Sequence, residues 1–179
     1  MPRLFTGIEV PEPMADDLSR LQGGLSSARW IDPEDFHISL RFIGDVDVRT
    51  ANDVADMLYA VKKRPLEVTL SGLGSFGGDK PRSLFIEVKQ SQPLMELQAE
   101  QERIMRRVGL APETRKFKPH VTLARLGRDA SARDVADWIA LRGLFLSRTF
   151  FVPRFVLFSA KEVVGGGPYL VEEAYTLAA

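Results

Sequence analysis

The stretches FKPHVTLAR (residues 117–125) and FHISLR (residues 36–41) contain the only two histidines of this 179-residue chain. Each histidine is followed by an aliphatic residue, a hydroxyl residue and a leucine: His37-Ile38-Ser39-Leu40 and His120-Val121-Thr122-Leu123. Branched and aromatic residues dominate both stretches, which predicts a β-strand in each half of the chain. This phrase is the one internal repeat, and it suggests two similar lobes that each give one strand to a shared cleft.

The strand period decides what the two phrases present to solvent. Residues i and i+2 of a strand point to the same face. His37 therefore projects with Ser39, and His120 with Thr122, while the aliphatic residues between them point into a core. If the two strands lie side by side, four polar side chains converge on one pocket.

The rest of the chain predicts a mixture of several hairpins and about four helices, and thus an α+β fold in a single domain, 1–179, made of two lobes. Strands are expected at 3–10, 35–44, 66–76, 83–89, 118–125, 148–160 and 168–177, with a GGG turn before the last. Helices are expected around 14–22, after a Thr50 cap, after Ser91 and Pro93, and after a Ser131–Asp134 cap. Their apolar faces are Val54, Leu58 and Val61; Leu94, Leu97, Ile104, Met105 and Val108; and Val135, Trp138 and Ile139.

Composition limits the classes of function. Hydrophobic residues make up 45% of the chain and the formal net charge is zero, so the core is ample and broad adhesion to a nucleic-acid backbone is not expected. The absence of cysteine excludes disulfides, thiolate metal sites and a cysteine nucleophile. Neither a signal peptide nor an apolar run of about 20 residues is visible, so a cytoplasmic protein that contacts no membrane is expected.

Two imidazoles that face one substrate suit paired acid–base catalysis, because histidine titrates near physiological pH. Two hydroxyls beside them can hold an anionic oxygen. The competing interpretation is that each histidine is a structural residue with its hydrogen bonds satisfied, which would be sufficient for one of the two stretches alone. By average residue usage, both histidines would be followed by the same pattern by chance only about once in several thousand. A zinc site lacks a third marked ligand, and a serine nucleophile lacks the usual elbow sequence.

On these residues the chain resembles the 2H phosphoesterases, which are named for two His-x-[Ser/Thr]-x motifs, and within them the RNA 2′,3′-cyclic phosphodiesterases, historically called 2′-5′ RNA ligases. The likeness extends to RLFTGIEVP (3–11), WIDPEDFHISLRFIGDV (30–46), and the closing FVLFSAKEVVGGGPYLVEEAYTL (155–177). Ser39 departs from the threonine that is commoner in this subfamily, but it keeps the hydroxyl. The resemblance implies two pseudo-twofold-related lobes of antiparallel sheet with flanking helices and a central cleft.

The resemblance also implies a reaction: hydrolysis of a terminal 2′,3′-cyclic phosphate on RNA to a 2′-phosphate, without metal or cofactor, and reversible as 2′-5′ ligation. It would make His37 the general acid on the departing O3′ and His120 the general base. Ser39, Thr122 and Arg125 would bind the phosphate. Running the reaction backwards exchanges the acid and the base, so the pair is better defined than the two labels.

Two arginines conflict with the strand period. Strict alternation places Arg125 opposite His120, although the resemblance implies that it reaches the phosphate. Alternation places Arg41 on the His37 face, where the family offers no role. For Trp30 and Phe5, core packing is the expected role and base stacking the alternative.

Other activities remain open at this stage. The same cleft could act on a small cyclic nucleotide such as ADP-ribose cyclic phosphate, or bind RNA or a nucleotide without catalysis. The expected partners are therefore RNA 3′ ends or small cyclic nucleotides, with the protein acting as a monomer.

Overall fold

A computed structural model describes residues 3–143, 145, 147–160 and 168–178. Its strands are β1 Arg3–Glu9, β2 Ala28–Trp30, β3 His37–Asp45, β4 Leu66–Phe76, β5 Ser83–Val88, β6 His120–Leu126, β7 Arg148–Val152, β8 Arg154–Ala160 and β9 Tyr169–Thr176. Its helices are α1 Glu12–Ser19, α2 Val48–Met57, α3 Gln92–Val108 and α4 Ala132–Ala140, with short 3₁₀ turns at Pro33–Asp35 and Leu58–Ala60. The GGG turn predicted before the last strand lies outside the described residues.

Two of the predicted helices begin where the sequence places their caps. The Ser91 side chain accepts the Leu94 N–H at the start of α3, and the Ser131 side chain accepts the Asp134 N–H at the start of α4. Gly109 ends α3 in the left-handed conformation, at φ 99°, which glycine adopts without steric cost.

The other two helices differ from the prediction at their ends. Asp47, not Thr50, caps α2, because its carboxylate accepts the Thr50 N–H at 2.7 Å, and Val61 lies beyond the helix. Helix α1 starts at Glu12 rather than near residue 14, since a proline such as Pro13 is tolerated in the first turn, where its missing N–H has no partner to lose.

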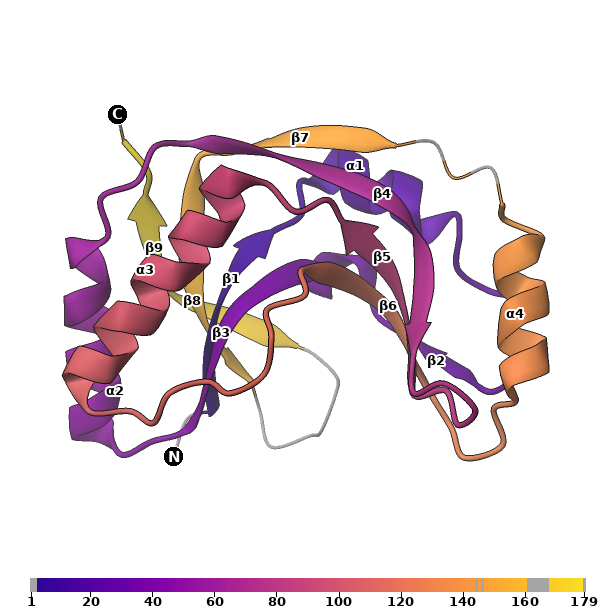
Figure 1. Ribbon diagram of the computed structural model, residues 1–179, viewed down its shortest axis with the longest axis horizontal. Helices are drawn as coiled ribbons and strands as arrows, with labels where there is room; N and C mark the ends of the chain where they lie inside the picture. The colour runs from indigo at the N-terminus through magenta and orange to yellow at the C-terminus, as the bar shows by residue number, and fades with distance from the viewer. Residues whose placement is uncertain (1–2, 144, 146, 161–167, 179) are drawn as a thin grey trace.

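All nine strands form one antiparallel sheet in the order β7-β4-β5-β6-β3-β1-β8-β9, with β2 paired to β6. The order is symmetric about the β6–β3 pair, so β4, β5 and β7 on one side match β8, β1 and β9 on the other. Helices α2 and α3 lie together at one end of the molecule and α4 lies at the other (Figure 1). The α+β fold with two related lobes and flanking helices is therefore as predicted, and the lobes share a single sheet.

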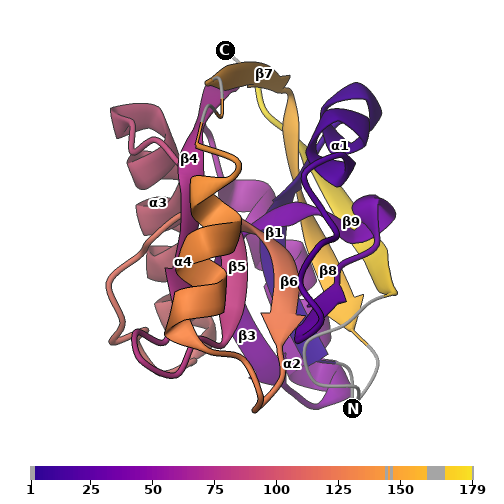
Figure 2. The same ribbon diagram turned by 90° about the vertical axis from the view of Figure 1, so that its right-hand side faces the viewer.

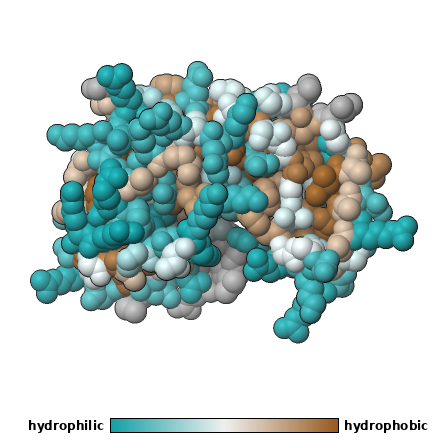
Figure 3. Space-filling view, viewed as in Figure 1, coloured by the Kyte–Doolittle hydropathy of each residue, from teal (hydrophilic) through white to brown (hydrophobic). Residues whose placement is uncertain are grey.

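The two lobes meet along a short contact. The β3–β6 ladder consists of the pair Ile38↔Val121, and both side chains are fully buried. The view from the α4 end shows β6 and β3 arching between the flanking helices (Figure 2). Hydrophilic side chains cover the α2–α3 end of the molecule, whereas apolar atoms are exposed toward the α4 end (Figure 3).

Trp30 and Phe5 pack as expected for core residues. The Trp30 ring lies 5.6 Å from Trp138, whose indole N–H donates to the Gly23 carbonyl. Phe5 is 6% exposed and stacks on Phe158 at 5.0 Å. In the described part of the chain no helix is long and apolar enough to cross a membrane.

Candidate active site

The pairing of β3 with β6 places the four predicted site residues on one face. Because Ile38 lies opposite Val121 in an antiparallel pair, the next positions along the register place Ser39 beside His120 and His37 beside Thr122. Each imidazole thus faces the hydroxyl of the other lobe, and the two imidazoles occupy opposite corners of the array. Diagonal neighbours of this kind have Cβ atoms roughly 7–8 Å apart, which leaves room for a phosphate between them.

The two imidazoles are oriented by the same backbone contact. Nδ1 of His37 lies 2.8 Å from the Asp35 carbonyl oxygen, and Nδ1 of His120 lies 2.7 Å from the Lys118 carbonyl oxygen. A carbonyl only accepts, so each Nδ1 donates its hydrogen, and in the neutral ring each Nε2 is an acceptor. The Ser39 hydroxyl lies 3.0 Å from Nε2 of His37 and donates to it when the ring is neutral.

Aromatic rings enclose both imidazoles. His37 contacts Phe5, Phe158 and Tyr169 at 5.1, 5.6 and 4.9 Å between ring centroids. His120 contacts Phe76 and Phe85 at 4.9 and 5.3 Å. These walls come from both lobes and remove water from one side of each imidazole.

This enclosure shifts the titration of both rings in the same direction. Desolvation is the main cause that lowers the pKa of His37 to about 4, assisted by the charges of His120 and Arg125 and opposed by the Asp35 carbonyl. Desolvation also lowers the pKa of His120, assisted by Arg125 and Lys118 and opposed by the Lys118 carbonyl. The free protein therefore holds both rings neutral at pH 7.

A bulge in β6 resolves the conflict over Arg125. Thr122 pairs with Phe85 and Ala124 with Leu84, so Leu123 is an extra residue in β6. The extra residue reverses the alternation beyond it and turns Arg125 to the face of His120 and Thr122. The charge of Arg125 accordingly acts on both histidines.

The same bulge recurs in β3 and corrects the expectation for Arg41. Ser39 pairs with Gly7 and Arg41 with Thr6, so Leu40 is the extra residue, at the position equivalent to Leu123. Arg41 is therefore turned away from His37 into the interior, where it is 6% exposed and binds Glu102 of α3. Strand periodicity was wrong for both arginines, because neither bulge is visible in a two-residue period.

Three residues near the site were not predicted as site residues, because nothing in the sequence pattern marks them. Phe42 follows the β3 bulge as Arg125 follows the β6 bulge, and it is 48% exposed. Arg29 of β2 pairs with Arg125, and the charges of both arginines oppose the desolvation that raises the pKa of Tyr169. Tyr169 reaches His37 from β9, and its backbone N–H donates to the Asp35 carboxylate at 3.2 Å.

Within the described residues, no group of three or more His, Cys, Asp or Glu side chains lies close enough together to hold a metal ion. The two titratable rings, the two hydroxyls and the Arg125 guanidinium are thus the chemical groups gathered here. They can hold an anionic tetrahedral centre and move protons on its two opposite sides, which is the chemistry that a two-histidine phosphoesterase requires.

Comparison with known proteins agrees with that class. The model of the 2′-5′ RNA ligase superfamily matches residues 10–162, and the chain belongs to this family of 2H phosphoesterases. An RNA 2′,3′-cyclic phosphodiesterase of Aeropyrum pernix is 34% identical over 63% of this chain and 68% of its own length. The Geobacillus stearothermophilus protein of the same name is 32% identical over 86% of this chain, which spans 51% of that protein.

Solved structures share the fold. Escherichia coli LigT in complex with 3′-AMP superposes with a TM-score of 0.79 at 18% identity, over 100% of both chains. A protein of Thermus thermophilus superposes with a TM-score of 0.80 at 21% identity, over 98% of this chain and 97% of its own.

Proposed function

We propose that this protein hydrolyses the terminal 2′,3′-cyclic phosphate of RNA to a 2′-phosphate by paired histidine catalysis, without a metal. The observation that carries the proposal is the array of His37, Ser39, His120 and Thr122 on one face of the β3–β6 pair, in which a backbone carbonyl occupies Nδ1 of each imidazole and leaves Nε2 for proton transfer. The relatives named RNA 2′,3′-cyclic phosphodiesterase support the substrate class.

The array suits an in-line displacement at phosphorus. The phosphate lies between the Ser39 and Thr122 hydroxyls, which donate to its non-bridging oxygens. The Arg125 guanidinium balances the negative charge of these oxygens. One imidazole accepts a proton from the attacking water while the other, at the opposite corner, protonates the departing O3′. The P–O3′ bond breaks as the new P–O bond forms, and the phosphate stays on O2′.

Following the family pattern, His37 is assigned as the acid and His120 as the base. The low pKa of His37 means that the free protein does not supply the acid in charged form. The bound phosphate anion does, because a negative charge next to an imidazole stabilises the imidazolium. The substrate therefore brings about the protonation that its own leaving group requires.

The decisive experiment is incubation with an oligonucleotide that ends in 2′,3′-cyclic phosphate, in the presence of EDTA. The expected product is a 2′-phosphate end, formed at the same rate with and without chelator. No turnover would exclude the enzyme function, loss of turnover in EDTA would exclude the metal-free mechanism, and a 3′-phosphate product would exclude O3′ as the leaving group.

Arg125→Ala is expected to lower kcat/KM for the cyclic phosphate by about 10- to 100-fold, since a hydrogen bond to a charged group contributes about 1.5–3 kcal/mol. The matched control is Arg133→Ala on the exposed face of α4, which is expected to leave the rate unchanged. Steady-state kinetics of both variants check this. Equal activity of the two would mean that Arg125 does not contact the phosphate.

The pH dependence follows from the two imidazole pKa values. Catalysis needs His37 protonated and His120 neutral, and in the free protein desolvation lowers the pKa of both rings, that of His37 to about 4. We expect kcat/KM to peak below pH 6.5 and to fall above it, with the alkaline limb of kcat displaced upward by the bound anion. Profiles of both parameters for adenosine 2′,3′-cyclic phosphate test this, and a kcat/KM optimum above pH 7.5 would contradict it.

A small cyclic nucleotide is the second candidate substrate, favoured by the complex of the LigT structure with a mononucleotide, 3′-AMP. Comparing kcat/KM for a cyclic mononucleotide and for a cyclic-phosphate trinucleotide separates the two. The same comparison covers the non-catalytic alternative, which predicts binding of either compound without turnover.

A further inference from the structure

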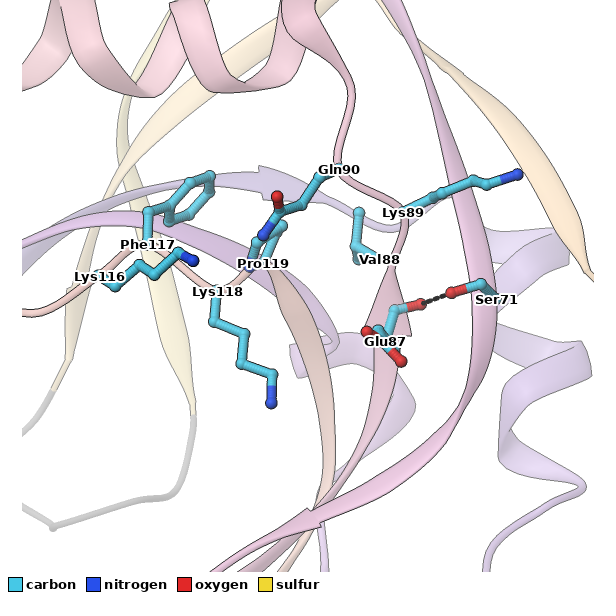
Figure 4. A pocket seen from close by; sticks show the side chains of 9 residues that line it. All are labelled: Ser71, Glu87, Val88, Lys89, Gln90, Lys116, Phe117, Lys118 and Pro119. Carbon is cyan, nitrogen blue, oxygen red and sulfur yellow. Dashed lines mark hydrogen bonds between the residues drawn. The ribbon is translucent and has the colours of Figure 1, made fainter.

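A pocket of about 480 Å³ opens beside the His120 half of the site, between β5 and the segment that leads into β6. It is lined by Ser71, Glu87, Val88, Lys89, Gln90, Lys116, Phe117, Lys118 and Pro119, and by neither histidine. Figure 4 shows the Lys116 ammonium and the Gln90 amide directed toward the space between these segments, whereas Lys89 extends away from it. Among the described residues, no ion pair neutralises the three lysines.

The pocket is continuous with the wall of His120. The Lys118 ammonium lies 5.1 and 5.4 Å from the ring centroids of Phe76 and Phe85, the two rings that enclose His120. Glu87 is the direct cross-strand partner of His120, so its side chain leaves the same face of the sheet. The pocket therefore borders residues that pack around His120 or pair with it.

The lining describes the chemistry of its ligand. Lys116 and Lys118 provide a positive region for a phosphate, and the Glu87 carboxylate and Gln90 amide can bond to hydroxyl or amino groups. Phe117 and Pro119 supply an apolar surface. A phosphate, a sugar and an apolar ring together make a nucleotide.

The position of the pocket relative to the two histidines indicates whether this nucleotide carries the cyclic phosphate or attacks it. The ribose that carries the cyclic phosphate must place O3′ at the acid, and the attacking oxygen comes from the opposite corner, at the base. With His120 as the base, the pocket lies on the side of the incoming nucleophile. In hydrolysis that nucleophile is water, and the pocket has no part in the reaction.

Building on the proposed function, we propose that this pocket is a binding site for an acceptor nucleotide that carries a free 5′-hydroxyl and a 3′-phosphate. His120 takes the proton of the 5′-hydroxyl, the O5′–P bond forms, the P–O3′ bond breaks, and His37 gives its proton to O3′. The product is a 2′-5′ phosphodiester, and no nucleotide cofactor is consumed because the strained cyclic phosphate is the activated group. Lys116 binds the 3′-phosphate of the acceptor.

The test uses adenosine 2′,3′-cyclic phosphate as the donor, which has no upstream nucleotide, and either uridine or uridine 3′-phosphate as the acceptor. The native protein is expected to form more 2′-5′ dinucleotide from uridine 3′-phosphate than from uridine at equal concentration. Lys116→Glu and Gln90→Glu are each expected to reduce this preference about fivefold, the scale of reversing or adding one charge near a partly exposed phosphate. Hydrolysis of the donor is expected to stay within about twofold of the native rate.

Lys62→Glu, the same change at an exposed lysine outside the pocket, is the control and is expected to change neither rate. Hydrolysis without any transfer, or equal transfer to both acceptors, would overturn the acceptor site while leaving the phosphodiesterase intact. A loss confined to donors longer than one nucleotide would also overturn it, since it would place the donor strand in the pocket. Absence of hydrolysis by the native protein would instead reject the proposed function itself.

Discussion

Replacing either His37 or His120 by alanine is expected to lower kcat/KM for an RNA 2′,3′-cyclic phosphate by about 10²–10⁴-fold, the usual contribution of a general acid or base. Both imidazoles lie on one face of the β3–β6 pair, and both are oriented through Nδ1 by a carbonyl two residues upstream. Neither side chain can replace the other, because they stand at opposite corners of the array. Initial rates of the two variants measure the losses.

The two losses are expected to respond differently to the leaving group. An acid is needed only for a poor leaving group, so a 3′-deoxynucleoside 2′-(p-nitrophenyl phosphate), which has no 3′-hydroxyl to attack the phosphorus, should restore most of the rate to the variant that lacks the acid. It should not restore the variant that lacks the base, because water still has to be deprotonated. With His37 as the acid, His37→Ala recovers and His120→Ala does not.

Each possible outcome decides between assignments. The opposite pattern would exchange the acid and base, which would also place the acceptor pocket on the leaving-group side. Recovery of both variants, or full activity of either one on the cyclic phosphate, would contradict the paired mechanism. Circular dichroism of each variant serves as the folding control.

Periodicity predicted the candidate site because the main features of that site are local. A histidine and a hydroxyl two residues apart share a face of any regular strand, and the pairing of β3 with β6 brings the two phrases together as predicted. The helix N-caps at Ser91 and Ser131, which bond to N–H groups three residues later, were also predicted correctly. The Thr50 cap was wrong because the helix begins three residues earlier, where the Asp47 carboxylate caps it by accepting the Thr50 N–H.

What periodicity could not predict depends on partners remote in sequence. Leu40 and Leu123 are bulge residues, and a bulge is defined by the pairing with a neighbouring strand. The faces on which Arg41 and Arg125 lie could therefore not be predicted from the sequences of β3 and β6 alone. The aromatic walls have the same origin: Phe158 and Tyr169 reach His37 from strands far along the chain. The depressed pKa of His37 is a property of this assembly and not of its own segment.

Arg41 makes the buried ion pair that holds the β3 bulge to the rest of the protein. Its Nε donates to Glu102 at 2.5 Å, and its two terminal nitrogens donate to the carbonyls of Phe42 and Ala111. Glu102 in turn accepts the Glu113 N–H at 3.0 Å and binds the exposed Arg106. One guanidinium thus joins β3, α3 and the segment that leads to His120.

Glu102→Ala is expected to reduce the free energy of unfolding by about 3 kcal/mol, because it leaves the Arg41 charge buried without its counter-ion. Arg106→Ala removes the exposed partner of the same carboxylate and is expected to cost less than about 1 kcal/mol. Replacing both members of the buried pair, Arg41→Met with Glu102→Met, should recover most of the loss, since no buried charge then remains. Urea denaturation at pH 7 measures all three.

The pH dependence of this loss provides an independent check. Burial alone would raise the pKa of Glu102, but the hydrogen bonds from Arg41 and the Glu113 N–H lower it below its usual value. The carboxylate therefore contributes stability above its unfolded pKa, and this contribution disappears as the pH falls through the lower folded value. The difference between native protein and Glu102→Ala should shrink in acid. A difference that is constant with pH, or equal losses for Glu102→Ala and Arg106→Ala, would show that the Arg41 charge does not depend on Glu102.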